Sequence, residues 1–276
     1  MSQIKFPKET SNTSNYLSLI DLEDAKELVW MGAERWLEED IKNLSITHVE
    51  HKILVPLPGL NISISGVLDL QGKCNETGDL KQFSNSIYIA DWKTSKSSLD
   101  SDWKTRLLDS WQWRIYSFAL GAKVFSYRGL SRKGETREVI FEVPENNDQQ
   151  VVEYLKGASL MMRPLLESNL EVYPRHMPFA CKAYGRDCPH LLDCKDYTMP
   201  RKAVNDLKDD PFKGYLSISY SQLEKLFLCP ERMRRDMIAD KGEDSSEAGL
   251  GKCVHAGLEN LYKQATKNIA GTLLNG

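Results

Sequence analysis

The sequence predicts an α/β fold, in which helices flank a central mixed β-sheet. Residues 60–70 alternate apolar and polar side chains with a period of two, which is typical of a strand. Residues 86–93 form the run SIYIADWK, which is typical of a buried strand. Residues 21–42, in contrast, repeat their apolar side chains at helical spacing. Strands and helices therefore share this chain of 276 residues, which is long enough to bury a substantial core.

The N-terminal part of the chain contains further expected elements. Residues 1–15 are rich in Ser, Thr and Asn, have little to bury and are expected to be disordered. A strand over 46–57 leads through a turn at Pro58-Gly59 into the strand at 60–70, and the polar residues 71–85 predict a loop. The elements expected after the strand at 86–93 are a helix at 105–120, strands near 122–128 and 136–143, and a helix at 148–168.

The C-terminal part begins with less regular sequence. Residues 171–199 are rich in Pro and Cys and are expected to be irregular, and residues 201–214 resemble a polar linker. Ser219 and Gln222 then have the spacing of a capping box. This pair predicts the start of a helix that runs to Cys229-Pro230 and resumes after the proline.

Composition and charge restrict the classes of function. The net charge of −3 gives no overall signature of nucleic-acid binding, so any such contact must come from a local basic surface. No apolar run reaches the length of a membrane span, and the polar N-terminus lacks the apolar segment of a signal peptide. We therefore expect an intracellular, cytoplasmic protein without a membrane partner.

The most informative pattern joins two strands. Asp69 ends the motif Gly66-Val67-Leu68-Asp69, and Asp91 and Lys93 follow in the next strand along the chain. Either motif alone is weak, because an Asp at a strand end is most often a cap or a turn former. Since side chains alternate along a strand, Asp91 and Lys93 share one face. Two carboxylates that can hold a hard cation, beside a lysine that can stabilise developing charge, are what metal-dependent phosphodiester cleavage requires.

Two helices carry polar residues that can face this site. Gln112 and Tyr116 lie one turn apart on the helix at 105–120, although an amphipathic helix can carry such a pair by chance. His255 and Glu259 have i, i+4 spacing on a helix near the C-terminus, where a lone His is more often structural than a ligand. The glycines that precede His255 predict a close backbone approach, which favours the ligand interpretation.

Three cysteines form a C-x6-C-x5-C pattern in the irregular segment. In an intracellular chain such a cluster favours metal binding over disulfides. The spacing matches neither a zinc ribbon nor a bacterial ferredoxin, and three unpaired thiols in a loop are the alternative. Three thiolates need a fourth ligand, for which Cys229 is the best candidate. The cluster residues are Cys181, Cys188 and Cys194, and the other candidates for the fourth ligand are His176 and His190.

Together these motifs resemble the RecB-like and Cas4-like exonuclease branch of the PD-(D/E)XK nuclease superfamily. Each motif alone is weak, but the set is specific and spans most of the chain. The resemblance implies a restriction-endonuclease-like core with an irregular segment bound to an Fe–S cluster. The matching segments are Gly66-Val67-Leu68-Asp69, Asp91-Trp92-Lys93-Thr94, Gln112 to Tyr116, the three-cysteine segment, Ser219 to Pro230 and Gly251 to His255.

The resemblance also implies roles for individual residues. It implies that Mg²⁺ or Mn²⁺ binds His255, Asp69, Asp91 and the backbone carbonyl of Trp92, and that Lys93, Gln112 and Tyr116 complete the catalytic set. A [4Fe–4S] cluster, with zinc as the alternative metal, is implied at Cys181, Cys188, Cys194 and Cys229. Two glutamates are further possible site residues: Glu50, where the family often has a glutamate on a preceding strand, and Glu259.

The motifs stand in an unusual order. In the family the Cys-Pro and Gly-x-x-x-His segments precede the Gly-x-x-Asp motif, whereas here they come last. We expect residues 16–200 to form the nuclease core with its C-terminal cysteine segment, and residues 215–270 to complete the same domain by circular permutation. Two alternatives are that residues 215–270 complete a second copy by swapping, which implies self-association, or that they begin a truncated second domain.

The function expected from the resemblance is metal-dependent DNA cleavage. The favoured activity is exonucleolytic hydrolysis of single strands or duplex ends, in recombination and repair or in phage DNA processing, in a bacterial or phage-encoded context. The motifs are compatible with either digestion polarity and with RNA as well as DNA. The alternative is a non-catalytic Fe–S DNA-binding module on the same fold, although such a module has no need for the two acids and the lysine.

Overall fold

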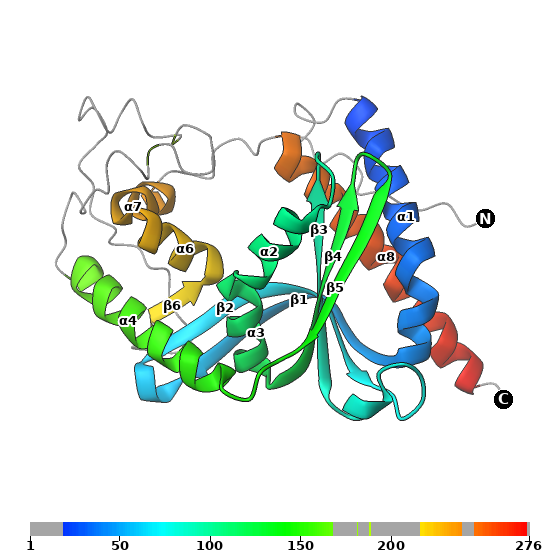
Figure 1. Cartoon of the computed structure of the whole chain (residues 1–276), viewed down its shortest axis with the longest axis horizontal. Coiled ribbons are helices and arrows are strands. Elements are labelled where there is room, and N and C mark those ends of the chain that lie inside the picture. Colours follow the sequence, from blue (N-terminus) through cyan, green and yellow to red (C-terminus); the bar gives the residue numbers. More distant parts are fainter. Residues whose placement is uncertain (1–18, 168–180, 182–187, 189–215, 239–245, 275–276) are drawn as a thin grey trace. The chain divides into compact units, whose positions relative to one another are not determined.

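The computed structural model describes residues 19–167, 181, 188, 216–238 and 246–274 (Figure 1). The expected disordered segment 1–15 and linker 201–214 lie outside the described residues, as does most of the irregular segment 171–199. The chain divides into two compact units. The first unit contains residues Met1–Lys52, Val67–Asn147 and Glu243–Gly276, and the second contains Ile53–Gly66 and Asp148–Gly242.

The sheet is mixed, as the sequence predicts. Its strand order is β1-β2-β3-β4-β5, and β6 pairs with β2 (Figure 1). β2 is antiparallel to β3, β3 is parallel to β4, and β4 is antiparallel to β5, while β6 runs parallel to β2. The strands are β1 (Leu44–Leu57), β2 (Ile62–Cys74), β3 (Ile87–Ser95), β4 (Ala122–Ser131), β5 (Glu135–Glu142) and β6 (Leu216–Ser219).

Helices occur in both units, and with the sheet they confirm the predicted α/β class. The first unit contains α1 (Leu19–Asn43), α2 (Ser101–Leu108), α3 (Trp111–Leu120) and α8 (Ser246–Leu274), together with the short 3-10 helix η2 (Lys81–Phe83). The second unit contains the 3-10 helix η1 (Pro58–Leu60), α6 (Tyr220–Leu228) and α7 (Pro230–Ile238). Helix α4 (Asn147–Glu167) begins at the boundary of the units and continues into the second.

Three details differ from the sequence-based expectation. The single helix predicted at 105–120 is two helices, because Asp100 and Ser110 each cap a helix by accepting a hydrogen bond from a following backbone amide. The predicted loop at 71–85 begins later than expected, since β2 continues to Cys74 through its pairing with β3. Strand β6 was not predicted. The capping box at Ser219 and Gln222 is confirmed.

Helices α1 and α8 pack against each other and cover one face of the sheet in the first unit (Figure 1). Their apolar side chains join those of the strands in one buried core, which includes Leu28 of α1, Leu258 of α8 and Trp92 of β3. The two helices approach closely at Gly257, where an added Cβ would lie 2.5 Å from Cγ2 of Val29. This packing fixes α8 over strand β3.

Helices α2 and α3 contact the strand residues that alternate with those facing α1 and α8. Trp113 of α3 packs edge-on against Phe141 of β5, with 4.8 Å between ring centroids. Trp103 of α2 lies over Gly129 of β4, where a Cβ would come within 2.6 Å of the indole. A glycine at this position therefore permits the approach of α2. Because side chains alternate along β3, Trp92 points toward α8, whereas Asp91 and Lys93 point toward α3.

A buried ion network ties the helices to the sheet on the α1 and α8 side. The guanidinium of Arg128 in β4 binds both oxygens of Asp40 in α1, at 2.5 and 2.6 Å. It also donates to Glu138 at 3.0 Å and to the hydroxyl of Tyr88 at 3.0 Å. Tyr262 of α8 donates to the same Asp40 carboxylate. Burial opposes ionisation of Glu138, but the charge of Arg128 outweighs it and lowers the Glu138 pKa.

We predict that Asp40→Asn lowers the free energy of unfolding by about 3–5 kcal/mol, because it leaves the buried guanidinium of Arg128 without its bidentate partner. Urea denaturation measures the change. The matched control is Glu39→Gln, since Glu39 pairs with Arg35 on the exposed side of the same helix, where loss of the pair changes the free energy by at most about 1 kcal/mol. Equal effects of the two substitutions would contradict this account of the network.

Candidate active site

Three metal-ligating side chains converge in the first unit. Ligand atoms of Glu50 in β1, Asp69 in β2 and His255 in α8 all lie within 4.8 Å of one another. Nδ1 of His255 is 3.1 Å from Oε1 of Glu50 and 3.3 Å from Oδ1 of Asp69, and its Nε2 is 3.2 Å from the carbonyl oxygen of Trp92. Residues far apart in the sequence thus meet at one point.

Glu50 has an unusual backbone conformation. Its φ is 50°, in the left-handed region, although the residue lies inside strand β1. A non-glycine residue in this region is uncommon and costs of order 1–3 kcal/mol, and such residues cluster at functional sites. The same Glu50 pairs with Nδ1 of His255, so the unusual conformation occurs at the point where β1 meets α8.

The imidazole of His255 lies between oxygen atoms on both sides. Both of its ring nitrogens face oxygen acceptors, and only the doubly protonated ring can donate to both sides. Burial opposes this charge, but the carboxylates of Asp69 and Glu50 outweigh burial and raise the His255 pKa to about 10. Two carboxylates therefore attract a cation to this position, and a metal ion bound by His255 would take the place of a proton on the ring.

A second polar group lies beside the first. Lys93 Nζ is 2.5 Å from Oδ2 of Asp91 and donates to Oε1 of Gln112 at 3.0 Å. The amide nitrogen of Gln112 donates to Oδ1 of Asp91 at 2.8 Å. The three side chains thus form a closed ring of contacts, and α3 supplies the residue that orients both charged groups of β3.

One hydrogen bond connects the two groups. The backbone amide of Trp92, between Asp91 and Lys93, donates to Oδ2 of Asp69 at 2.6 Å. Asp69 and Asp91 are both buried, with relative exposure of 5% each. Burial raises the pKa of Asp91, the ammonium of Lys93 opposes that shift, and the charge of Asp69 adds to it. Two carboxylates held this closely favour a bound cation.

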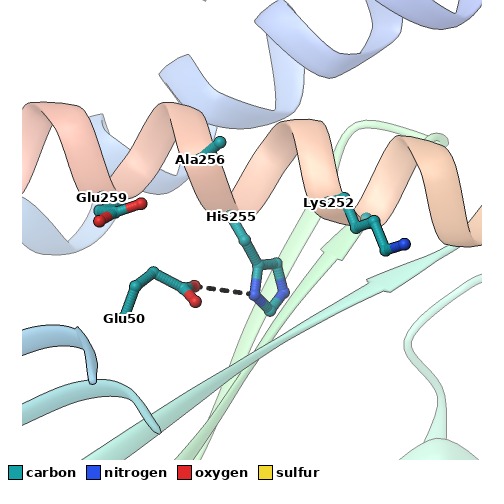
Figure 2. Close-up of a pocket in the computed structure, with 6 residues that line it drawn as sticks. Glu50, Lys252, His255, Ala256 and Glu259 are labelled. Atoms are coloured by element: carbon teal, nitrogen blue, oxygen red, sulfur yellow. Dashed lines mark hydrogen bonds and ion pairs between the residues drawn. The ribbon is translucent and has the colours of Figure 1, made fainter. Parts of the chain in front are cut away.

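A pocket adjoins the converging residues (Figure 2). Its volume is about 320 Å³, and Glu50 forms one side while α8 forms the other. Figure 2 shows the contact between Glu50 and His255, with Lys252 on the same helix one turn before His255. The residues that line the pocket are Glu50, Gly251, Lys252, His255, Ala256 and Glu259.

The remaining predicted site residues occupy varied positions. Tyr116 is buried on α3, one turn after Gln112. Glu259 lines the pocket and forms an ion pair with Lys263. The compact ligand group contains Glu50 in addition to Asp69 and His255, while both oxygens of Asp91 contact Lys93 or Gln112. Sequence reasoning did not single out Lys252, because a lone lysine on a helix is usually a solvated residue.

Comparison with protein families decides the class of this fold. The profile of the PD-(D/E)XK nuclease superfamily matches residues 3–194. The chain belongs to this superfamily. The matched residues include Glu50, Asp69 and Asp91, whereas His255 lies beyond them. The PD-(D/E)XK superfamily is a superfamily of metal-dependent nucleases.

Other comparisons add little to the superfamily assignment. A search of the curated proteins found no match. Among solved structures, the chain is similar to "Crystal structure of SSO0001", with 17% identity and a TM-score of 0.32. That similarity covers 52% of this chain and 59% of the other.

In the part of the chain that the structure describes, no helix has both the length and the apolarity to span a membrane.

The converging residues fit a divalent metal ion. PD-(D/E)XK nucleases use such metals, and both carboxylate oxygens and imidazole nitrogens are ligands for divalent cations. The predicted cysteine ligands do not form such a group among the described residues. Cys194 lies outside the described residues, and among the residues that are described the side chains arranged closely enough to hold a metal ion are Glu50, Asp69 and His255. Cys181, Cys188 and Cys229 are not gathered into such a group.

Proposed function

We propose that this PD-(D/E)XK protein is a DNA exonuclease that hydrolyses phosphodiester bonds with Mg²⁺ or Mn²⁺. The observation that carries the proposal is the convergence of Glu50, Asp69 and His255 beside the contact ring of Asp91, Lys93 and Gln112. Asp69, Asp91, His255 and the Trp92 carbonyl are the proposed metal ligands, and Glu50 is a further candidate ligand. When bound, the metal activates water and stabilises charge on the phosphate.

The protein residues have distinct proposed roles around that metal. Lys93, held by Asp91 and Gln112, presents its ammonium to the charge that develops on the phosphate, where an oriented cation is most effective. The backbone amide of Trp92 fixes the orientation of Asp69. Gln112 holds Lys93 and Asp91 in place through hydrogen bonds, and Tyr116 is buried one turn later on the same helix.

We further propose that α8 completes the nuclease domain by circular permutation. Its support is the packing of α8 on α1 and the position of His255 beside Asp69 within the first unit. The alternative of a swapped copy predicts self-association, which light scattering of the purified protein measures. A monomer with full activity would support completion within one chain.

The exonuclease assignment is tested with substrates that differ in their ends. Linear single-stranded and duplex DNA are compared with covalently closed circles of the same sequence, in Mg²⁺ or Mn²⁺. An exonuclease degrades the linear forms to short products and leaves the circles intact. Cleavage of the circles would assign endonuclease activity and overturn the exonuclease proposal. Matching RNA substrates test the preference for DNA.

We also propose a [4Fe–4S] cluster, or zinc, on Cys181, Cys188, Cys194 and Cys229. The support is that Cys181, Cys188 and Cys229 belong to the second unit and that the amide of Cys188 donates to the carbonyl of Cys181 at 2.7 Å, which brings two of the cysteines together. Four thiolates suit either metal.

We predict that Cys229→Ser lowers the metal content of protein purified without oxygen, because three thiolates leave one coordination position open. Elemental analysis distinguishes iron from zinc and measures the loss. Cys253→Ser is the control, since Cys253 lies in the first unit. Equal metal content in the parent and in Cys229→Ser would refute the assignment of Cys229 as a ligand.

A further inference from the structure

Helix α8 presents more than His255 to the pocket. Lys252 lies three residues before His255, and Figure 2 shows both side chains extending from the same side of the helix. Residues at this spacing are neighbours on a helix surface. Among the six residues that line the pocket, Lys252 is the one lysine or arginine.

The turn of α8 that carries Lys252 lies close to the catalytic strand. A Cβ added to Gly251 would sit 3.3 Å from Oγ1 of Thr94, the residue after Lys93 in β3. The glycine therefore allows the helix backbone to approach the end of β3. This approach places Lys252 near the strand that carries Asp91 and Lys93.

The two lysines differ in exposure, since Lys93 is half-buried and Lys252 is exposed. Lys93 contacts Asp91 and Gln112, so its ammonium is held at the site of reaction. Lys252 is exposed at the pocket, where its long side chain can reach a bound molecule. A nucleic-acid strand carries one negative charge for each nucleotide, so a strand with one phosphate at the metal group presents the next phosphate a single nucleotide away.

We propose that Lys252 binds the phosphate next to the scissile one and positions the strand in the pocket. The proposal rests on the nuclease function proposed above. It makes the preferred substrate a strand with at least two consecutive phosphates, rather than an isolated phosphodiester. Lys252 is a positioning residue, which contributes to KM and to discrimination between substrates.

The test compares two substrates in Mn²⁺. One is a single-stranded oligonucleotide, and the other is a thymidine p-nitrophenyl phosphodiester, which carries one phosphate. Lys252→Gln is expected to raise KM for the oligonucleotide about tenfold, since a charge-assisted hydrogen bond is lost. Its effect on the single-phosphate substrate is expected to be less than twofold. Lys252→Arg keeps the charge and should retain most of the affinity.

Salt dependence and a matched control sharpen the comparison. Loss of one phosphate contact should reduce the slope of log KM against log salt by about 0.7 for a single strand. Lys267→Gln, at an exposed position later on α8 that does not line the pocket, should leave KM and the slope unchanged. A neutral methylphosphonate next to the scissile phosphate should weaken binding by the parent but not by Lys252→Gln.

Three results would overturn the inference. An unchanged KM for the oligonucleotide in Lys252→Gln would show that Lys252 does not contact the neighbouring phosphate. An equal loss on both substrates would place Lys252 at the scissile phosphate or at the metal. A parent that cleaves neither substrate would contradict the proposed nuclease function itself, and this inference would fail with it.

Discussion

Replacement of Asp91 by Asn is expected to reduce DNA cleavage by about 10²–10³-fold or more, the range seen when one preorganised electrostatic contact to a transition state is lost. The carboxylate has two roles in the proposed site, as a metal ligand and as the partner that holds the Lys93 ammonium at 2.5 Å. Asn keeps the shape of Asp and can still accept from Gln112, but it carries no charge. Initial rates at saturating Mn²⁺ measure the loss.

The fold of this variant should not change. Asp91 is buried, so its charge is costly to keep, and an uncharged isostere removes that cost. Circular dichroism and thermal unfolding should match the parent. Asp102→Asn, at an exposed position on α2, is the control and should cleave at the parental rate. Parental activity in Asp91→Asn would rule out Asp91 as a catalytic residue.

Replacement of His255 by Ala is expected to raise the metal concentration for half-maximal activity tenfold or more. The substitution removes a proposed ligand and leaves the carboxylates of Glu50 and Asp69 without the imidazole between them. Loss of a residue that only hydrogen-bonds to a metal ligand costs about 10–100-fold in metal affinity, and loss of a direct ligand should cost at least as much. Calorimetric titration with Mn²⁺ measures the affinity independently of cleavage.

His48→Ala provides the matched control for this prediction. His48 is an exposed residue of β1 that stacks on His51, with ring centroids 4.1 Å apart, and it is not part of the converging group. Its loss should leave the metal affinity unchanged. If His255→Ala also bound Mn²⁺ like the parent, α8 would not complete the site, and the truncated-domain arrangement would be favoured.

Local sequence patterns predict the strands that carry the site. The apolar run of β3 ends at Asp91, which is buried. The period of two in β2 predicts the strand and puts Asp69 on the face opposite Leu68, but the structure buries both residues. The same alternation predicts that Asp91 and Lys93 share a face, which their direct contact confirms. These features follow from the pleat of single strands, so a short window of sequence contains them.

Features that depend on distant partners could not be predicted in this way. The burial of Arg128 depends on Asp40, which lies 88 residues earlier in the chain. The left-handed backbone of Glu50 has no local signal, because Glu has no special preference for that conformation. The division of the helix at Ser110 did have a signal, since Asp100 and Ser110 are both favoured capping residues.

The proposed site likewise contains residues that short motifs predict and residues that depend on distant partners. Asp69, Asp91 and Lys93 were identified from two short motifs, but the position of His255 beside Glu50 joins residues 205 positions apart in the chain. Only the resemblance to the nuclease family, whose motifs stand here in a different order, suggested that connection. Lys252 was overlooked because its neighbourhood depends on the approach of Gly251 to Thr94, which involves two separate elements.

The measurement that tests the central claim most directly is cleavage of end-labelled single-stranded DNA by the full chain, with Mg²⁺, with Mn²⁺ and with EDTA. The account predicts that the label is released with either metal, that EDTA abolishes the release, and that Asp91→Asn releases almost none. A folded protein that binds Mn²⁺ and DNA but leaves the strand intact would contradict the account, and would favour a non-catalytic DNA-binding module.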